Sequence, residues 1–173
     1  MIEIKTLKDI DVFTNPEHEV PETFEERQTV KIIIKNEEGK IALITNPVHN
    51  FFLLPGGGAE SEDLVKEAER EAVEETNWFT TNITEVGKLE EFRNRGAKHY
   101  ITTCFTADAT TENDVDLRTE EEKENGLVTK WFTYEEAIEI MEEQVEKVKR
   151  GEVEFYNTAF NIVRDYSFVK DLK

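Results

Sequence analysis

The chain has 173 residues, of which 35% are charged and 38% hydrophobic, and its 39 acidic and 21 basic side chains give a formal net charge of −18. This length suits one domain with a sizeable core, and the 10% of aromatic residues argue against a disordered chain. The acidic balance argues against a nucleic-acid polymer or an anionic membrane surface as partner, because no basic patch neutralises phosphates. The chain has neither a membrane-length apolar run nor the features of a signal peptide, so we expect it to be cytoplasmic.

The first third of the chain is predicted to be mostly β-structure. A short strand is expected at residues 2–7, and residues 9–27, with two prolines and many acids, are typical of an extended arm or loop. Residues 29–34 (TVKIII) are rich in β-branched side chains and predict a central strand. Residues 40–45 (KIALIT) predict the strand that returns after a turn at residues 36–39.

A run of glycines and a helix come next. The short apolar run at residues 51–54 stops at Pro55, which precedes three consecutive glycines. Helical periodicity is then expected from about Ser61, which is a good N-cap, to about Thr76. Asn77 is expected to end this helix as a left-handed C-cap.

The remainder of the chain mixes strands and helices. In chain order, the patterns predict strands at 83–93 and 98–107, a polar acidic loop at 108–126, a strand at 128–132, a helix from a capping box at Thr133 to about Arg150, and a last helix at about 153–171. This order favours an α/β protein built as an α/β/α sandwich around a mixed β-sheet. We expect a single domain over residues 1–173, with an N-terminal arm at 1–27 and a C-terminal helix at 153–173.

Carboxylates gather on the helix that follows the glycines. Between Glu60 and Glu75 the sequence has eight acidic and two basic residues. On a helical projection an acidic stripe lies beside an apolar one, and the two stripes consist of Glu67, Glu71, Glu74 and Glu75, and of Leu64, Val65, Ala68 and Ala72. Glu75 falls within the angular range of the apolar stripe, so we expect it to be partly buried. A divalent cation would offset the repulsion between these acids, their unfavourable place in the helix dipole and their burial.

Two interpretations of this helix are open on residue patterns alone. A solvated acidic helix would rely on pairs such as Arg70–Glu74 and would need no ligand. The three glycines before the helix favour the other interpretation, in which the backbone comes close to whatever the carboxylates hold. The one cysteine, Cys104, lies in a predicted strand and is expected to be a small buried hydrophobe rather than a nucleophile.

The segment from Pro55 to Trp78 resembles the signature of the Nudix (MutT-like) hydrolase family. That signature is G-x5-E-x7-R-E-U-x-E-E-x-G-U, where U is a bulky apolar residue. In this chain Gly56 is followed after five residues by Glu62, and seven residues later comes the run Arg70-Glu71-Ala72-Val73-Glu74-Glu75-Thr76-Asn77-Trp78. Downstream, residues 131–137 (WFTYEEA) are similar to the strand and helix that end many members.

The match departs from the family pattern at three places. Ala72 stands where the signature has a bulky apolar residue, and Asn77 stands in place of the glycine. Asparagine is the next-best residue for a left-handed backbone. The loop between Gly58 and Glu62 is one residue shorter than in many members.

The resemblance implies a Nudix fold and a metal site made of box glutamates. Glu71, Glu74 and Glu75 would hold Mg²⁺, for which Mn²⁺ can substitute, and the carbonyl of Gly56 or Gly57 would add a ligand.

It also implies roles for the remaining residues of the box. Arg70 would orient the carboxylates by charge-assisted hydrogen bonds, and Glu62 would brace the loop against the helix through Arg70. A general base or further metal ligand is expected from a downstream loop, where Glu124 is the first choice and Glu121 and Glu122 are the alternatives. Any of these three is otherwise a solvated loop acid.

Cations are needed to bind substrate phosphates beyond the metal. The candidates are Arg27, Arg93 and Arg95, with Lys98 beside them, although each alone is otherwise a surface charge. None of the three histidines has metal-ligand spacing.

The function implied by the resemblance is hydrolysis of a pyrophosphate bond in a small nucleoside-diphosphate-linked substrate. A nucleoside triphosphate, ADP-ribose, a nucleotide sugar or a dinucleotide all satisfy this description. The alternatives are a catalytically inactive Nudix-fold module that binds or senses nucleotides, and an acidic domain that buffers metal or binds proteins. A homodimer is a further expectation, based on the N-terminal arm and the final helices.

Overall fold

The computed structural model describes residues 4–47, 50–116, 118–124 and 126–172. Their strands form one sheet and are β1 (Lys5–Lys8), β2 (Glu25–Lys35), β3 (Ile41–Thr45), β4 (Phe52–Leu53), β5 (Gly56–Gly58), β6 (Trp78–Arg93), β7 (Lys98–Glu112) and β8 (Val128–Phe132). The strand order is β1-β6-β7-β2-β3-β4, with β5 paired to β2 and β8 paired to β3. The pairs β1–β6 and β2–β7 are parallel and the others antiparallel, so the sheet is mixed, as predicted.

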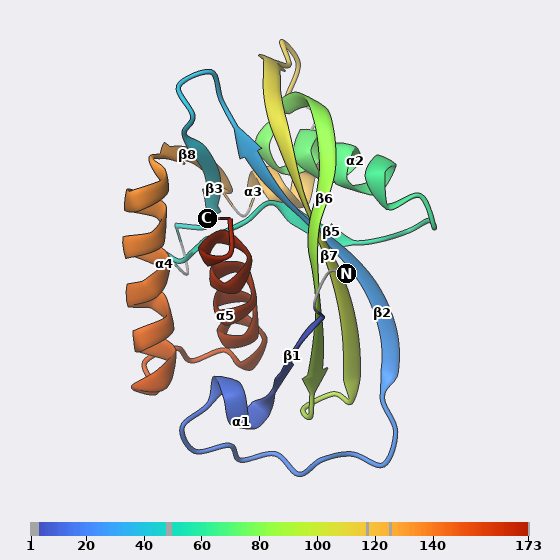
Figure 1. Cartoon of the computed structure of the whole chain (residues 1–173), viewed down its shortest axis with the longest axis vertical. Helices are drawn as coiled ribbons and strands as arrows, with labels where there is room; N and C mark the ends of the chain where they lie inside the picture. The colour runs from blue at the N-terminus through green and yellow to red at the C-terminus, as the bar shows by residue number, and fades with distance from the viewer. Residues whose placement is uncertain (1–3, 48–49, 117, 125, 173) are drawn as a thin grey trace.

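Helices cover both faces of this sheet (Figure 1). The long ones are α2 (Leu64–Thr76), α4 (Tyr134–Lys149) and α5 (Tyr156–Lys170), and the short ones are α1 (Asp9–Val12) and α3 (Glu120–Glu124). α2 lies on one face, whereas α4 and α5 lie together on the other. This arrangement confirms the predicted α/β/α sandwich.

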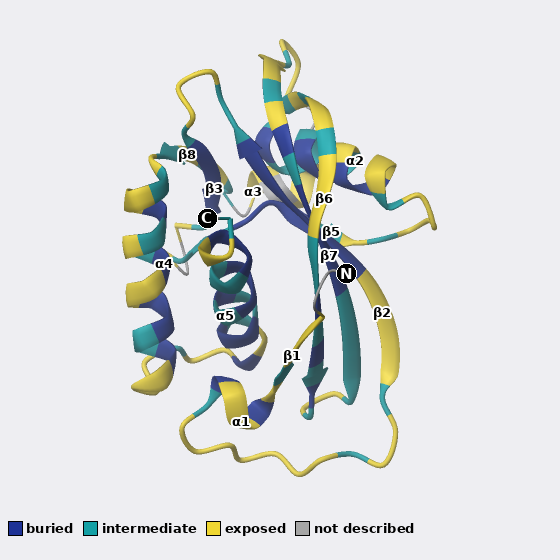
Figure 2. Cartoon of the chain, in the orientation of Figure 1, coloured by how far each residue is buried: buried dark blue, intermediate teal, exposed yellow. Residues whose placement is uncertain are grey.

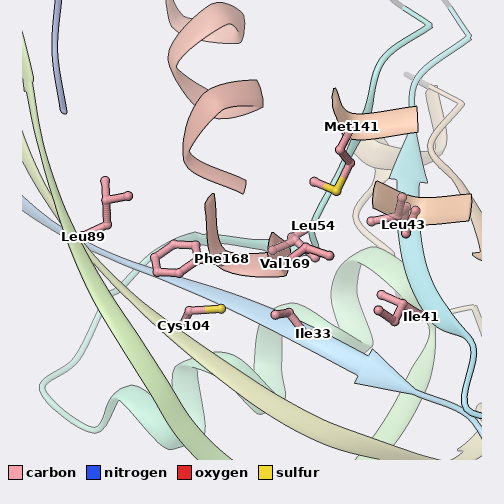
Figure 3. Close-up of a cluster of buried hydrophobic side chains, with 10 residues drawn as sticks. Ile33, Ile41, Leu43, Leu54, Leu89, Cys104, Met141, Phe168 and Val169 are labelled. Carbon is pink, nitrogen blue, oxygen red and sulfur yellow. The ribbon is translucent and has the colours of Figure 1, made fainter. Parts of the chain in front are cut away.

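The central strand β2 divides the core into two layers, because side chains alternate between the faces of a strand. Val30, Ile32 and Ile34 pack with Ala68 and Ala72 of α2. Ile33 points the other way and joins a cluster with side chains from β3, α4 and α5, among them Leu43, Met141, Phe168 and Val169 (Figure 3). Both clusters are buried, which explains why residues 30–34 of β2 are apolar except for Lys31.

Cys104 belongs to the cluster on the α5 side and is fully buried. Burial raises the pKa of its thiol, so the reactive thiolate is disfavoured. The prediction that Cys104 acts as a small hydrophobe is therefore confirmed.

Several elements differ in extent from the predictions. β6 and β7 pair from Arg93↔Lys98 back to Trp78↔Glu112, so both strands are longer than expected. The expected acidic loop at 108–126 contains the end of β7 and α3. The expected arm at 9–27 contains α1 and the start of β2, and part of the predicted first strand lies outside the described residues. These strand ends are polar and exposed, so the apolar pattern underestimates them (Figure 2).

α2 starts three residues after the predicted Ser61, so that prediction is wrong. The helix begins at Leu64, and Asp63 is the N-cap whose Oδ1 accepts a 3.2 Å hydrogen bond from the backbone N–H of Lys66. The hydroxyl of Ser61 instead donates to Glu67 at 2.8 Å. Asn77 has φ 63° and ends the helix in the left-handed conformation, as predicted. Among the described residues, no helix has both the length and the apolar character needed to cross a membrane.

Candidate active site

The glycine strand β5 places its backbone directly against the end of α2. Gly56 has φ 142°, and a Cβ there would lie 2.1 Å from the carbonyl oxygen of Val30. A Cβ on Gly57 would lie 2.6 Å from Oε1 of Glu71. The backbone N–H of Gly56 donates a 2.8 Å hydrogen bond to Oε2 of Glu75. Glycine is therefore required at position 56, where a Cβ would meet backbone atoms, and at position 57 it lets the Glu71 carboxylate lie directly against the strand.

Arg70 connects the acidic stripe of α2 with the glycine strand. Its Nη1 lies 2.8 Å from Glu74 Oε2, and its Nη2 lies 3.0 Å from Glu71 Oε1 and 2.8 Å from Glu67 Oε2. The same Nη2 also donates to the carbonyl of Gly58 at 3.2 Å. One guanidinium thus orients three carboxylates, which is the role predicted for Arg70, and it offsets part of their mutual repulsion.

Glu67, and not Glu62, braces the loop between β5 and α2. Glu67 is buried and accepts hydrogen bonds from the Glu60 backbone N–H at 3.1 Å, from the Ser61 hydroxyl and from Arg70. Glu62 is exposed, and the contacts of Arg70 go to other residues, so the predicted Glu62–Arg70 brace is wrong. Glu62 lies at the exposed rim of the outer cavity, whereas Glu67, one turn into α2, points back at the loop.

The brace is expected to weaken in acid. The hydrogen bond from Arg70, together with those from the Glu60 N–H and the Ser61 hydroxyl, lowers the pKa of Glu67 from 4.5 to about 2. A carboxyl group with a lowered pKa in the folded state stabilises the fold above its unfolded pKa, and this contribution disappears as the pH falls towards 2. We expect the stability difference between wild type and Glu67→Gln to be constant above about pH 4.5 and to shrink below it.

Urea denaturation of both proteins from about pH 7 to about pH 3 measures this difference directly. Glu69→Gln, an exposed acid on the same helix, serves as the control and is expected to follow wild type throughout. A difference between wild type and Glu67→Gln that did not change with pH would contradict the assigned brace.

Two neighbouring cavities border the glycine strand. The outer cavity, of about 990 Å³, is lined by residues 26–29 of β2, residues 58–62 and 64, Glu71 and Tyr100. The inner cavity, of about 300 Å³, is lined by Thr29, Lys31, Gly56, Gly57, Gly58, Arg93, Tyr100, Asn157, Asn161 and Arg164. The two cavities share Thr29, Gly58 and Tyr100. They thus adjoin each other at the glycine strand.

Comparison with known proteins decides the family. Residues 25–155, most of the chain, match the NUDIX domain. The chain belongs to the Nudix family. Nudix hydrolases cleave pyrophosphate bonds in small nucleotide substrates and generally use a divalent metal such as Mg²⁺. No curated protein sequence matches the chain.

Solved structures show the same fold at low identity. A NUDIX hydrolase from Nitrosomonas europaea is 18% identical with a TM-score of 0.54, and the match covers 83% of this chain and 89% of that one. The mutator MutT protein from Bacillus halodurans is 19% identical (TM-score 0.53, covering 66% and 72%). A MutT NUDIX hydrolase from Burkholderia pseudomallei is 21% identical (TM-score 0.50, covering 64% and 85%). At these identities the likeness establishes the fold alone.

The Nudix box glutamates suit a hard divalent cation by their chemistry. Three carboxylates on one side of α2, those of Glu67, Glu71 and Glu74, contact one guanidinium, and Glu75 on the same helix accepts from the Gly56 N–H. Mg²⁺ prefers such oxygen ligands. Within the described ranges, no group of three or more acidic, histidine or cysteine side chains is arranged to hold a metal ion. Arg70 draws Glu71 and Glu74 to itself, and Glu75 bonds to Gly56, so metal binding requires these side chains to turn. Glu75 is half-buried, as predicted, while Glu67 and Glu71 are more deeply buried.

The predicted substrate cations are distributed over three places. Arg27 lines the outer cavity and forms an exposed ion pair with Glu25. Arg93 is buried and lines the inner cavity. Arg95 is exposed at the β6–β7 turn and lines neither of these cavities. Lys98 pairs with Glu25.

The predicted downstream acids are not brought into the site by this structure. Glu124 ends α3 with an exposed side chain, and it is not among the residues that line either cavity. Glu121 is likewise exposed. The side chain of Glu122, and the whole of His49, lie outside the described residues. The carbonyl of Gly56, a predicted metal ligand, lies 3.5 Å from Nζ of Lys31.

The sequence reasoning missed the polar wall of the inner cavity. Lys31 lies inside the apolar run of β2, and Asn157, Asn161 and Arg164 lie on α5 at helical spacing. The available signal was a polar stripe, at i, i+4 and i+7, on a helix whose other residues are largely apolar. Such a stripe on a helix against a sheet indicates a polar cavity or a buried ion network rather than plain core.

Proposed function

We propose that this Nudix protein is a divalent-metal-dependent pyrophosphohydrolase that acts on a small nucleoside-diphosphate-linked substrate. The observation that carries the proposal is that all the acids of the box are present and that two of them, Glu71 and Glu75, lie directly against a glycine strand. Glu71, Glu74 and Glu75 lie on one side of α2, and Glu71 also lines the outer cavity, which is large enough for a nucleotide. A module that only binds or senses nucleotides has no need for this complete acidic set.

Each residue of the site has a separate proposed role. Glu74 and Glu75, with Glu71, would hold Mg²⁺, and a backbone carbonyl of Gly56 or Gly57 would contribute a further oxygen. A bound divalent ion would supply positive charge to the pyrophosphate and acidify the attacking water. Arg70 positions the carboxylates through the contacts described above, and Glu67 holds the loop in place. Glu124 remains our proposed general base, and because it lines neither cavity this role requires α3 to approach the catalytic face.

The proposal is tested by incubating the purified protein with Mg²⁺ and a panel of compounds. The panel contains a nucleoside triphosphate, ADP-ribose, a nucleotide sugar and a dinucleotide, and the release of phosphate, pyrophosphate or nucleoside monophosphate is measured. We expect turnover of at least one compound that is abolished by EDTA and restored by excess Mg²⁺ or Mn²⁺. Binding of a nucleotide without turnover of any compound would favour the sensor instead.

A further inference from the structure

The wall of the inner cavity carries an excess of positive charge. Lys31, Arg93 and Arg164 line it and are each at most 7% exposed, and no lining residue is acidic. Behind this wall, among the residues that the structure describes, two carboxylates pair with the three cations, those of Glu91 and Asp165, and both are fully buried.

The distances show how tightly this network is built. Glu91 accepts from Arg93 at 2.7 Å and from Arg164 at 3.3 Å, while Asp165 lies 2.8 Å from Arg164 and 3.8 Å from Lys31. Three cations against two carboxylates leave one positive charge. A buried charge without a counter-ion is costly, so the cavity suits an anion. A buried excess of positive charge is unusual in a chain whose net charge is −18.

The hydrogen-bond donors in the cavity wall also favour an anion. Nε of Arg93 is buried, and no hydrogen-bond partner for it is found in the described part of the chain. Oδ1 of Asn157 and Oδ1 of Asn161 accept from Arg93 at 3.2 and 2.8 Å. Because a guanidinium is only a donor, it fixes the orientation of both amides and leaves their NH₂ groups as donors. Asn157 is also in the first turn of α5, where the helix dipole adds positive potential.

The inner cavity adjoins the catalytic face at the glycine strand. It shares Thr29, Gly58 and Tyr100 with the outer cavity, which Glu71 lines. The Arg93 guanidinium lies 4.5 Å from the centre of the Tyr100 ring, so this shared wall holds the cation in place. A ligand beside Glu71 therefore has a cationic, donor-rich cavity next to it.

We infer that the inner cavity is a subsite for a phosphate group that the substrate carries in addition to the pyrophosphate bond that is cleaved. This inference rests on the proposed function and narrows it. It favours a nucleoside triphosphate, or a nucleotide with a further phosphate, over ADP-ribose or a nucleotide sugar, in which both ends of the diphosphate are esterified. The donors that recognise the phosphate are Arg93, Asn157 and Asn161, with charge from Lys31 and Arg164.

Binding of inorganic phosphate in the absence of metal tests the subsite directly. Phosphate is titrated into the full chain in EDTA and followed by isothermal titration calorimetry. Wild type is expected to bind, and Asn161→Asp is expected to weaken binding at least about tenfold. Aspartate keeps an oxygen for Arg93, so the fold is retained, but it removes an amide donor and supplies the missing negative charge.

Thr158→Asp is the matched control, because it makes the same charge change on the same helix at a residue that does not line the inner cavity. Its phosphate affinity is expected to stay within about twofold of wild type, since Thr158 is only half-buried and lines neither the inner nor the outer cavity, so salt partly screens its charge. If Asn161→Asp does not fold, Asn157→Asp, at an exposed residue, replaces it. A wild type that does not bind phosphate, or equal loss in both aspartate variants, overturns the subsite.

Kinetics separate this inference from the proposed function. Asn161→Asp is expected to raise KM at least about tenfold for a nucleoside triphosphate but less than about twofold for a nucleotide sugar. An equal rise in KM for both compounds overturns the subsite while leaving the hydrolase intact. Conversely, if wild type binds phosphate but turns over no compound, the proposed hydrolase function is wrong, while the inner cavity remains an anion-binding site.

Discussion

Replacing Glu75 with Gln is expected to lower kcat by about three orders of magnitude while the protein stays folded. Glutamine has the same shape, and its amide oxygen can still accept the 2.8 Å hydrogen bond from the Gly56 N–H. It lacks the negative charge that a divalent cation requires, so roughly 4 kcal/mol of transition-state stabilisation is lost at about 1.4 kcal/mol per tenfold. Glu74→Gln is expected to behave in the same way, because Glu74 is on the same side of α2 and is the neighbouring proposed metal ligand.

The measurement is steady-state kinetics with the best compound of the panel at saturating Mg²⁺, with circular dichroism to check the fold. Glu69→Gln is the control, since Glu69 is an exposed acid on α2 that points away from the glycine strand. It removes the same charge and is expected to leave kcat within about twofold of wild type. Near-full activity in both Glu74→Gln and Glu75→Gln would show that the metal assignment is wrong.

A Gly56→Ala variant is expected to lose at least about 4 kcal/mol of folding free energy, which is enough to unfold many domains of this size. Gly56 has φ 142°, a conformation that L-residues rarely adopt, and its Cβ would lie 2.1 Å from the Val30 carbonyl oxygen and 2.9 Å from the Lys31 Cα. Both contacts are with backbone atoms of the central strand, which cannot move without breaking the β2–β5 pairing.

Gly58→Ala is the matched control for this prediction. Gly58 is two residues further along the same strand, has no positive φ, and would meet nothing within 4 Å of a Cβ. Its free energy of unfolding is expected to change by less than about 1 kcal/mol, mainly through the unfolded chain. Urea denaturation of the three proteins measures both effects. Equal stability of Gly56→Ala and wild type would mean that β5 is not held against β2 as described.

The cationic inner cavity offsets the repulsion between this acidic chain and an anionic substrate. A chain with a net charge of −18 repels polyphosphates, and the face of α2 adds acids to this repulsion. Lys31, Arg93 and Arg164 concentrate positive charge in the inner cavity, beside the glycine strand against which the glutamates of α2 lie. The metal and this cavity would then share the charge of the substrate between them. Removing the metal is expected to weaken substrate binding and to leave the inner cavity intact. A substitution in the inner cavity is likewise expected to weaken substrate binding and to leave the metal site intact.

The amino-acid sequence alone was enough to predict the Nudix family and the local structure of the box. Local patterns carry this information, because glycine before a helix, carboxylates at i+3 and i+4, and an asparagine C-cap each act over a few residues. The α/β/α sandwich also followed from the order of the elements. The left-handed Asn77 and the half-buried Glu75 were predicted on these grounds and are found in the structure. The contacts of Arg70 with the carboxylates were implied by the resemblance to the Nudix box.

The contacts between side chains from distant parts of the chain depend on how the strands and helices pack together, which the sequence patterns do not show. Glu67, and not Glu62, braces the loop, because the loop residues Glu60 and Ser61 fold back onto the first turn of α2. The spacing of residues in the sequence does not define where the loop meets the helix. Lys31, Arg93 and Arg164 come from β2, β6 and α5, and they are neighbours only because these strands and this helix pack together. A one-dimensional pattern records the periodicity of each element but not the register between elements, and the charge of the inner cavity depends on that register.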